Sequence, residues 1–337
     1  MLNFRLSRRL KFPSYWPTMG VDPKQPKQRL SPTPYTLENL TAAGSHSFVA
    51  KDSLYVGPER WSQVYGGSLS LPNAKVQNDL VLKIFNSSLL PFANIDANSE
   101  DWKISGPQHI SHNSYRYTDE LMAWAEVHAY SKLVSLQGTV VPRLVGAFMV
   151  QYPESDEEHI AIAMTRIRGN SFMDRCRKLG CEIDGDERWY PLALELMRRI
   201  YDIHQLGIIG LDIRDENIFV VDAPDAASSP SIKLFDFGFS RPNQFEDPED
   251  KKKHAVAFIT MKDVGGLTTL LLDTCGGDSG RPEWLVENGF TLEYRQRRWD
   301  FFQWIRREHP EEPFLSEWWD KYLSRTLPPP ETGASFF

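Results

Sequence analysis

The alternation of apolar and polar positions divides the chain into a strand-rich first half and a helix-rich second half. Short apolar runs rich in β-branched residues are typical of antiparallel strands, and one longer amphipathic pattern among them indicates a helix. The predicted strands are residues 53–56, 62–71, 79–85, 144–151 and 159–166, and the predicted helix is 119–136. Strands with one helix, followed by mostly helices, predict an α+β fold.

The second half begins with a clear helical pattern. Proline favours the first turn of a helix and glycine its end, so Pro191 and Gly207 predict the limits of this helix. Its apolar face is formed by Leu192, Leu196, Ile200 and Ile203. Short strands are then expected at 218–221 and 232–235, and further helices at 261–273 and within the Trp-rich stretch 292–325.

These patterns predict four segments. Residues 1–45 are rich in proline and polar residues and predict a loosely ordered leader. A small, β-rich N-lobe with one helix is expected at 46–166, with a polar insertion at about 86–117. A larger, helical C-lobe is expected at 167–325, before a tail at 326–337. The length of 337 residues also favours two lobes over one core.

Composition narrows the classes of function. The net charge of −7 disfavours a general nucleic-acid binder, which needs a large basic surface. No apolar stretch approaches the roughly 20 residues that span a bilayer, so no membrane partner is expected. Three cysteines are too few for a disulfide framework or a zinc cluster. The basic N-terminus lacks the apolar run of a secretory signal. We therefore expect an intracellular, cytoplasmic protein, with a mitochondrial presequence as the alternative.

Two charged residues stand where the pattern favours apolar ones. Lys83 lies inside the predicted strand 79–85 with apolar residues on both sides, and a buried lysine needs an anionic partner. The alternative is an edge lysine that extends to water. Glu126 lies on the apolar stripe of the predicted helix 119–136 and is the expected partner of Lys83; the alternative is a carboxylate on the margin of the stripe.

Two further clusters carry oxygen-bearing side chains. Asp212, Arg214 and Asn217 lie in a short loop before the predicted strand 218–221, and Asp236 closes the strand 232–235. Carboxylate and amide oxygens are ligands for Mg²⁺, particularly when phosphate oxygens complete its coordination. Taken singly, each of these residues is better interpreted as a polar residue of a turn.

The order of these features is that of the protein-kinase signatures: Lys in a strand, Glu in the next helix, Asp-x-x-x-x-Asn in a loop and Asp-Phe-Gly after a strand. The sequence resembles the protein-kinase superfamily, most closely the divergent kinase-like proteins of fungi, which are related to aminoglycoside and choline kinases. The segment 202–218 (DIHQLGIIGLDIRDENI) carries most of the resemblance, which extends over roughly residues 50–275.

The resemblance implies a bilobal, protein-kinase-like fold with the nucleotide between the lobes. It implies that Asp212 accepts the proton of the attacking hydroxyl and that Asn217 and Asp236 hold Mg²⁺. Arg214 lies where many members have a lysine that reaches the γ-phosphate. The implied activity is an ATP- and Mg²⁺-dependent transfer of the γ-phosphate to a hydroxyl acceptor, either a protein or a small molecule.

The resemblance also implies a nucleotide site in the N-lobe. Lys83 is expected to contact the α- and β-phosphates of ATP and to pair with Glu126. The loop that covers the phosphates, aligned on Val64, keeps only its first glycine, Gly57.

Three departures from the family pattern define the alternatives. Gly210 replaces the histidine two residues before the catalytic aspartate, and the glycine loop is degraded; both favour a pseudokinase that acts as an interaction scaffold. No Ala-Pro-Glu motif follows Asp236, which favours a small-molecule acceptor over a protein.

Overall fold

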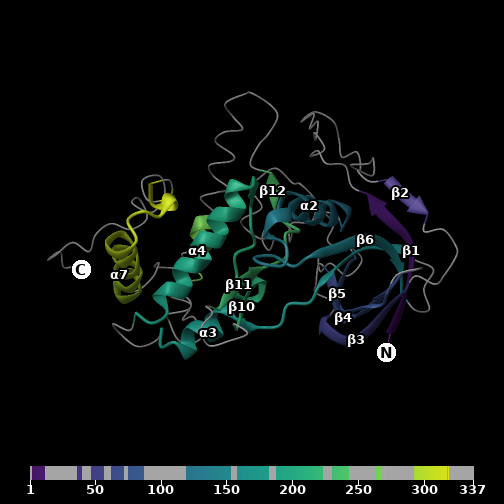
Figure 1. Ribbon diagram of the computed structural model, residues 1–337, viewed down its shortest axis with the longest axis horizontal. Coiled ribbons are helices and arrows are strands. Elements are labelled where there is room, and N and C mark those ends of the chain that lie inside the picture. The colour runs from purple at the N-terminus through teal and green to yellow at the C-terminus, as the bar shows by residue number, and fades with distance from the viewer. Residues whose placement is uncertain are drawn as a thin grey trace, which may run out of the picture. The chain divides into compact units, whose positions relative to one another are not determined.

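The computed structural model describes residues 2–11, 36–39, 47–56, 62–71, 75–86, 119–152, 158–181, 187–222, 230–242, 263–267, 270, 292–316 and 318 (Figure 1). The chain forms two compact units. The N-terminal unit comprises Met1–Gly138, Pro142–Arg166 and Phe237–Phe239. The C-terminal unit comprises Thr139–Val141, Ile167–Asp236 and Ser240–Phe337.

The N-terminal unit is built on a seven-stranded sheet in which every pairing is antiparallel. Its strands are β1 (Leu2–Lys11), β2 (Thr36–Asn39), β3 (Ser47–Tyr55), β4 (Ser62–Ser70), β5 (Gln77–Phe85), β6 (Leu144–Gln151) and β7 (Glu158–Thr165). Their order is β2-β1-β3-β4-β5-β7-β6. Together with the helices of both units, this sheet confirms the α+β prediction.

Strand β1 closes the sheet on itself. It pairs with β3 and also with β6, so that six strands form a ring to which β2 is added. The prediction of a loosely ordered leader at 1–45 is therefore wrong for Leu2–Lys11 and Thr36–Asn39. Leu2, Phe4 and Leu6 alternate with polar residues as in a strand, but the partners of β1 lie far along the chain and were not indicated by its own sequence. The rest of the predicted leader lies outside the described residues.

The interior of the ring is filled by inward-facing side chains at alternate strand positions. They include Leu6, Phe48, Tyr65, Leu69, Leu82, Ile84, Phe148 and Val150. Gly67 allows two strands to approach closely here, because a Cβ at this position would lie 2.1 Å from the backbone oxygen of Val49. The alternation of inward and outward positions leaves Lys83 facing away from this core.

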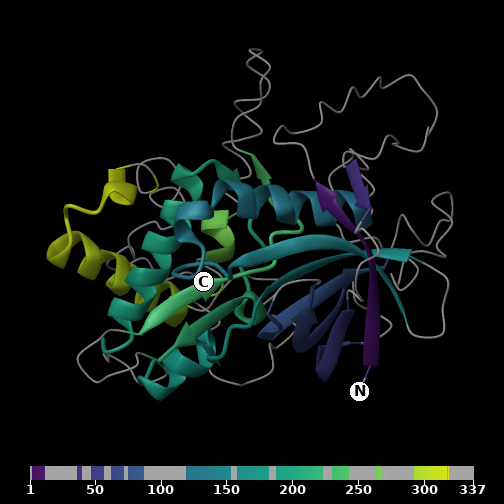
Figure 2. The same ribbon diagram turned by 45° about the vertical axis from the view of Figure 1, so that its right-hand side comes forward.

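Helix α2 (Asp119–Lys132) lies against the outer face of the sheet, as Figure 2 shows. A 3-10 turn follows at Val134–Leu136, and Gly138 adopts a φ of 83° just beyond it. The predicted helix 119–136 is thus confirmed, with a tighter last turn. The predicted insertion at about 86–117 lies outside the described residues except for Asn86.

The C-terminal unit contains helices α3 (Phe172–Lys178), α4 (Tyr190–Gln205) and α7 (Leu292–Glu308). Its strands form two small sheets, β11-β10-β8 and β12-β9. These strands are β8 (Asn170–Ser171), β9 (Ile208–Ile209), β10 (Ile218–Val221), β11 (Ser231–Leu234) and β12 (Arg241–Pro242). Pro191 lies in the first turn of α4 and Gly207 follows its end with a φ of 86°, so both predicted limits are confirmed.

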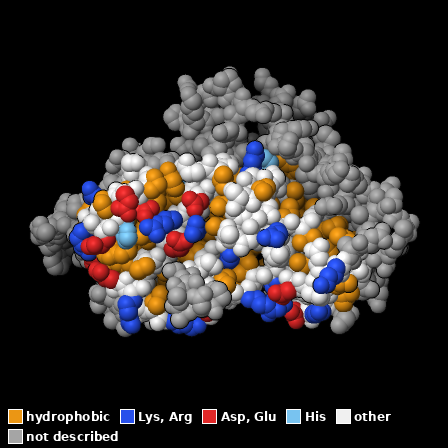
Figure 3. All heavy atoms as spheres, in the orientation of Figure 1, with side chains coloured by type: hydrophobic (Ala, Val, Ile, Leu, Met, Phe, Trp, Pro, Cys, Tyr) orange, Lys and Arg blue, Asp and Glu red, His pale blue; other side chains and the backbone are white. Residues whose placement is uncertain are grey.

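Helices α4 and α7 pack through aromatic side chains. Trp189 stacks on Phe301 with 5.3 Å between ring centroids, and Tyr190 contacts both Phe301 and Trp304. On the face drawn in Figure 3, acidic and basic side chains lie next to one another over this unit. Helix α4 carries ion pairs of Arg199 with Glu195 and with Asp202. Among the residues that the structure describes, no helix is both long and apolar enough to span a membrane.

Candidate functional site

The first group of predicted site residues is a buried ion pair in the N-terminal unit. Nζ of Lys83 lies 2.6 Å from Oε2 of Glu126. Lys83 is 5% exposed and Glu126 is fully buried. The alternatives of an edge lysine and a marginal carboxylate are therefore wrong. The two buried groups compensate one another, since either one alone would pay the full cost of desolvation.

Val64 shares a sheet face with Lys83. The two residues stand directly opposite one another in the β4–β5 ladder, and residues opposed in this way point to the same side. The N-terminal unit thus has an apolar residue beside Lys83 on the face that carries the lysine. Gly57, the remaining glycine of the expected phosphate loop, lies outside the described residues.

Helix α2 holds Glu126 in place through contacts on both sides of it. The hydroxyl of Tyr130 donates to Sδ of Met164 in β7 at 3.4 Å. Trp124 and His128, which lie one turn apart on either side of Glu126, stack with 4.9 Å between ring centroids. Burial, with a smaller contribution from Lys132, lowers the pKa of His128 to about 4. His128 is therefore neutral at physiological pH and packs as an aromatic side chain.

The second group lies in the C-terminal unit, in the segment 210–217, which we call the acidic loop. The side-chain nitrogen of Asn217 donates to the backbone oxygen of Asp212 at 2.9 Å and to its Oδ2 at 3.1 Å. The guanidinium of Arg214 also contacts this Oδ2, at 2.6 Å. The structure therefore brings Asp212, Arg214 and Asn217 together, as the sequence predicted.

Asp236 joins this group because β10 and β11 are antiparallel. Ile218 pairs with Leu234, so the residues before β10 and after β11 meet at one end of the sheet. The backbone amide of Phe235 donates to the backbone oxygen of Asn217 at 3.2 Å. Asp236 has a φ of 66°, a left-handed conformation that is costly for most residues and persists where the surroundings impose it.

The donor set in this unit fits a hard divalent cation. Asp236 supplies a carboxylate and Asn217 an amide oxygen, which are ligand types that Mg²⁺ accepts beside phosphate. Because the amide nitrogen of Asn217 bonds to Asp212, its oxygen is the atom left for a metal. Asn217 is 6% exposed, so its orientation is fixed by packing as well as by hydrogen bonds.

A buried aspartate supports the start of the acidic loop. Oδ2 of Asp263 lies 2.9 Å from Nε2 of His204 in α4 and accepts from the amide of Gly210 at 2.8 Å. Burial raises the pKa of Asp263, and the hydrogen bonds from His204 and the backbone act in the opposite direction. Gly210 has a φ of 75°, so the glycine is required by the turn that points its amide at Asp263.

Sequence reasoning missed the role of His204. The only available signal was a histidine next to Ile203 on a helix whose buried face is otherwise apolar. Such a position more often marks a histidine packed in the core than one with a polar partner. The partner, Asp263, lies 59 residues further along the chain, and no local sequence pattern links it to His204.

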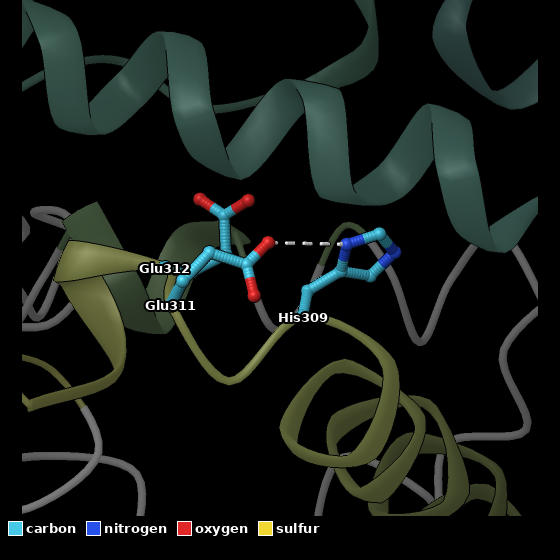
Figure 4. A group of neighbouring side chains, drawn as sticks. All are labelled: His309, Glu311 and Glu312. Carbon is cyan, nitrogen blue, oxygen red and sulfur yellow. Dashed lines mark ion pairs between the residues drawn. The ribbon is translucent and has the colours of Figure 1, made fainter.

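A third polar cluster lies after α7. His309, Glu311 and Glu312 bring their ligand atoms within 4.8 Å of one another (Figure 4). Nε of Arg198 donates to Glu312 at 2.8 Å, and this interaction raises the pKa of Arg198. The guanidinium thus already supplies the positive charge beside Glu312, and we interpret the cluster as an ion-pair network that joins this segment to α4.

The structure therefore assembles the predicted residues into two groups, one in each unit: Lys83, Glu126 and Val64 in the first, and Asp212, Arg214, Asn217 and Asp236 in the second. A comparison with protein-family models and with curated proteins finds no match to this chain.

Proposed function

We propose that this protein is an ATP- and Mg²⁺-dependent phosphotransferase of protein-kinase-like, bilobal fold that transfers the γ-phosphate to a hydroxyl acceptor. The observation that carries the proposal is the set Asp212, Asn217 and Asp236 at one end of the β10–β11 pair. Asp212 and Asn217 are hydrogen-bonded there, and Asp236, which follows the paired strand β11, has a positive φ. Unusual backbone conformations of this kind are concentrated at functional sites.

In the proposed reaction, the bond between the γ-phosphorus and its bridging oxygen breaks, and ADP leaves with the electron pair. The acceptor oxygen forms the new bond to phosphorus, and its proton passes to the carboxylate of Asp212. A bound Mg²⁺ supplies neutralisation of charge on the phosphate oxygens. Asn217 and Asp236 would hold that cation, and Arg214 orients the carboxylate of Asp212 through their ion pair.

The N-terminal unit supports the proposal through Lys83. Kinase-type phosphotransfer uses a strand lysine that contacts the nucleotide phosphates and is positioned by a glutamate on a helix. Lys83 and Glu126 have this relationship, on strand β5 and helix α2. A lysine whose ammonium is fixed in this way loses little conformational freedom on binding phosphate, which favours nucleotide affinity.

Gly210 favours a working enzyme over a scaffold. The glycine has a positive φ, and its amide bonds to buried Asp263, so its presence is explained by backbone geometry. The replacement of the family's histidine is therefore consistent with an acidic loop that is held in place by other contacts.

The first experiment measures nucleotide binding and transfer with the full chain. We expect Mg²⁺-ATP to raise the melting temperature by an amount that grows with nucleotide concentration. We expect labelled phosphate from γ-labelled ATP to appear on an acceptor when pools of peptides and of small hydroxyl compounds are supplied. The class of compound labelled identifies the acceptor class. ATP without a divalent cation should give a much smaller shift.

The matched variants are Asp236→Asn and Asp212→Asn. Asparagine tolerates the left-handed backbone of residue 236, so the first variant removes charge without changing the fold. We expect it to abolish the Mg²⁺-dependent part of the shift, and Asp212→Asn to retain binding but lose transfer by at least about 100-fold. Binding without transfer in the wild type would identify a scaffold. No binding at all would overturn the proposal.

A further inference from the structure

The segment that follows α7 packs along one face of α4. We call residues 309–316 and 318 the C-terminal segment. On α4, Arg198, Tyr201 and His204 are spaced by three residues and therefore lie on the same side of the helix. Each of the three contacts the C-terminal segment: Arg198 bonds to Glu312, Tyr201 packs on Phe314, and both Tyr201 and His204 pack on Trp318.

Trp318 is almost completely buried in this contact. It is 1% exposed, and its ring centroid lies 5.8 Å from that of His204 at an interplanar angle of 65°. Phe314 lies against Trp318, with 5.3 Å between centroids and 31° between ring planes. An edge-on aromatic contact of this kind limits the orientations that the histidine ring adopts.

The orientation of His204 determines what Asp263 does. Nε2 of His204 and the amide of Gly210 share the same oxygen of Asp263, at 2.9 and 2.8 Å. Asp263 is 2% exposed, so loss of the histidine contact would leave a buried carboxylate with less compensation. The carboxylate would then shift or become protonated, and the hydrogen bond that it accepts from the amide of Gly210 would weaken. Gly210 stands two residues before Asp212.

We propose that Trp318 is a positioning residue for the acidic loop: its ring fixes His204, His204 fixes Asp263, and Asp263 holds the amide of Gly210. In naming Asp212 as the group that is positioned, this inference rests on the proposed function. The C-terminal segment then influences the acidic loop through His204 and Asp263.

The test compares two tryptophan variants of the full chain. Trp318→Leu removes the aromatic contact to His204. Trp304→Leu is the matched control. Trp304 lies in α7 and also takes part in aromatic packing, but its neighbours are Tyr190, Phe301 and His309, and no contact joins it to His204 among the described residues. Hydrogen exchange of the Gly210 amide, followed by NMR, reports directly on its hydrogen bond to Asp263 and needs no catalytic activity.

We expect Trp318→Leu to speed exchange of the Gly210 amide at least 10-fold relative to amides of β10, and Trp304→Leu to change this ratio less than threefold. Trp318→Phe, which keeps an aromatic ring, should restore most of the protection. Should Trp318→Leu fail to fold, Trp318→Met, a flexible apolar side chain similar in volume to leucine that adapts to irregular gaps, gives the same comparison. Equal effects of the Trp318 and Trp304 variants, or uniformly faster exchange throughout the C-terminal unit, would overturn the proposal.

Two further measurements test whether Trp318 acts through His204 and whether its loss slows phosphate transfer. In a His204→Gln background, Trp318→Leu should add less than twofold to the exchange rate; independent, multiplying effects would exclude a route through His204. In the transfer assay, Trp318→Leu should lower kcat about 10-fold and leave the KM for ATP unchanged, the split expected for a misplaced base. If the wild type shows no transfer, the proposed function is wrong. The exchange measurements would still test whether Trp318 positions the acidic loop.

Discussion

Lys83 and Glu126 are separated by 43 residues in the chain and form a buried ion pair, with 2.6 Å between Nζ and Oε2. The pair joins the central part of the sheet to the helix that covers it. Replacing one partner leaves the other charge buried and uncompensated, whereas replacing both leaves none.

The first prediction concerns the stability contributed by this pair. Lys83→Met and Glu126→Leu should each lower the free energy of unfolding by about 3–5 kcal/mol, because each leaves one buried charge without its partner. The double variant should recover at least half of that loss. Denaturant unfolding of the three variants measures the difference. Strictly additive losses in the double variant would show that the two charges are not coupled in the folded protein.

The second prediction concerns the left-handed backbone at Asp236. Asp236→Ala should be less stable than Asp236→Asn by about 1 kcal/mol, because alanine lacks the short polar side chain that makes this conformation tolerable. The comparison is made by denaturant unfolding without nucleotide, so that metal binding does not contribute. Equal stabilities would show that residue 236 does not hold this φ in solution.

The third prediction concerns Gly210. Because Gly210 has a φ of 75°, Gly210→Ala should lower the free energy of unfolding by about 1–2 kcal/mol. Gly210→His, which introduces the residue typical of kinases, should also destabilise the protein and should not raise its activity. Gly265 is the matched control: it lies in a helical turn, and a Cβ there would meet nothing within 4 Å. Gly265→Ala should therefore stabilise the protein by about 0.4–1 kcal/mol. A more active Gly210→His variant would contradict the backbone explanation.

The fourth prediction concerns pH. The pKa of His128 is lowered from 6.5 to about 4 by burial, so the unfolded chain binds more protons than the folded protein between these values. The contribution of neutral His128 is therefore fully present above pH 6.5 and is lost as the pH falls towards 4, by up to about 3 kcal/mol.

The control for this pH dependence is His128→Phe, which keeps a ring against Trp124 and cannot titrate. Unfolding measured from pH 7 to pH 4 should show a steeper loss of stability in the wild type than in this variant. Parallel curves would mean that His128 titrates normally in the folded protein.

The helix and strand limits were predictable where local signals are strong. Pro191 and Gly207 mark the limits of α4, and β6 and β10 coincide with the predicted strands 144–151 and 218–221. The unusual placement of Lys83 and Glu126 within apolar patterns predicted their pairing, because a buried charge implies a partner. In each case the physical requirement acts over a few neighbouring residues.

The missed features share a different cause. The pairing of β1 with β3 and β6 depends on strands that begin more than thirty residues later, and no local pattern encodes a partner at that distance. The roles of His204 and Trp318 likewise depend on which helix faces which segment after folding.

The sequence alone thus determined the residue types for the proposed chemistry, the order in which they occur and most of the secondary structure, because propensity and burial act locally. Only the tertiary structure decided that the N-terminal strand closes the sheet, that Asp236 adopts a left-handed backbone, that Gly210 is required by its φ, and that Trp318 contacts the histidine behind the acidic loop. These features arise from packing between segments that are distant in the chain, and the free energy that selects them exists only once those segments meet.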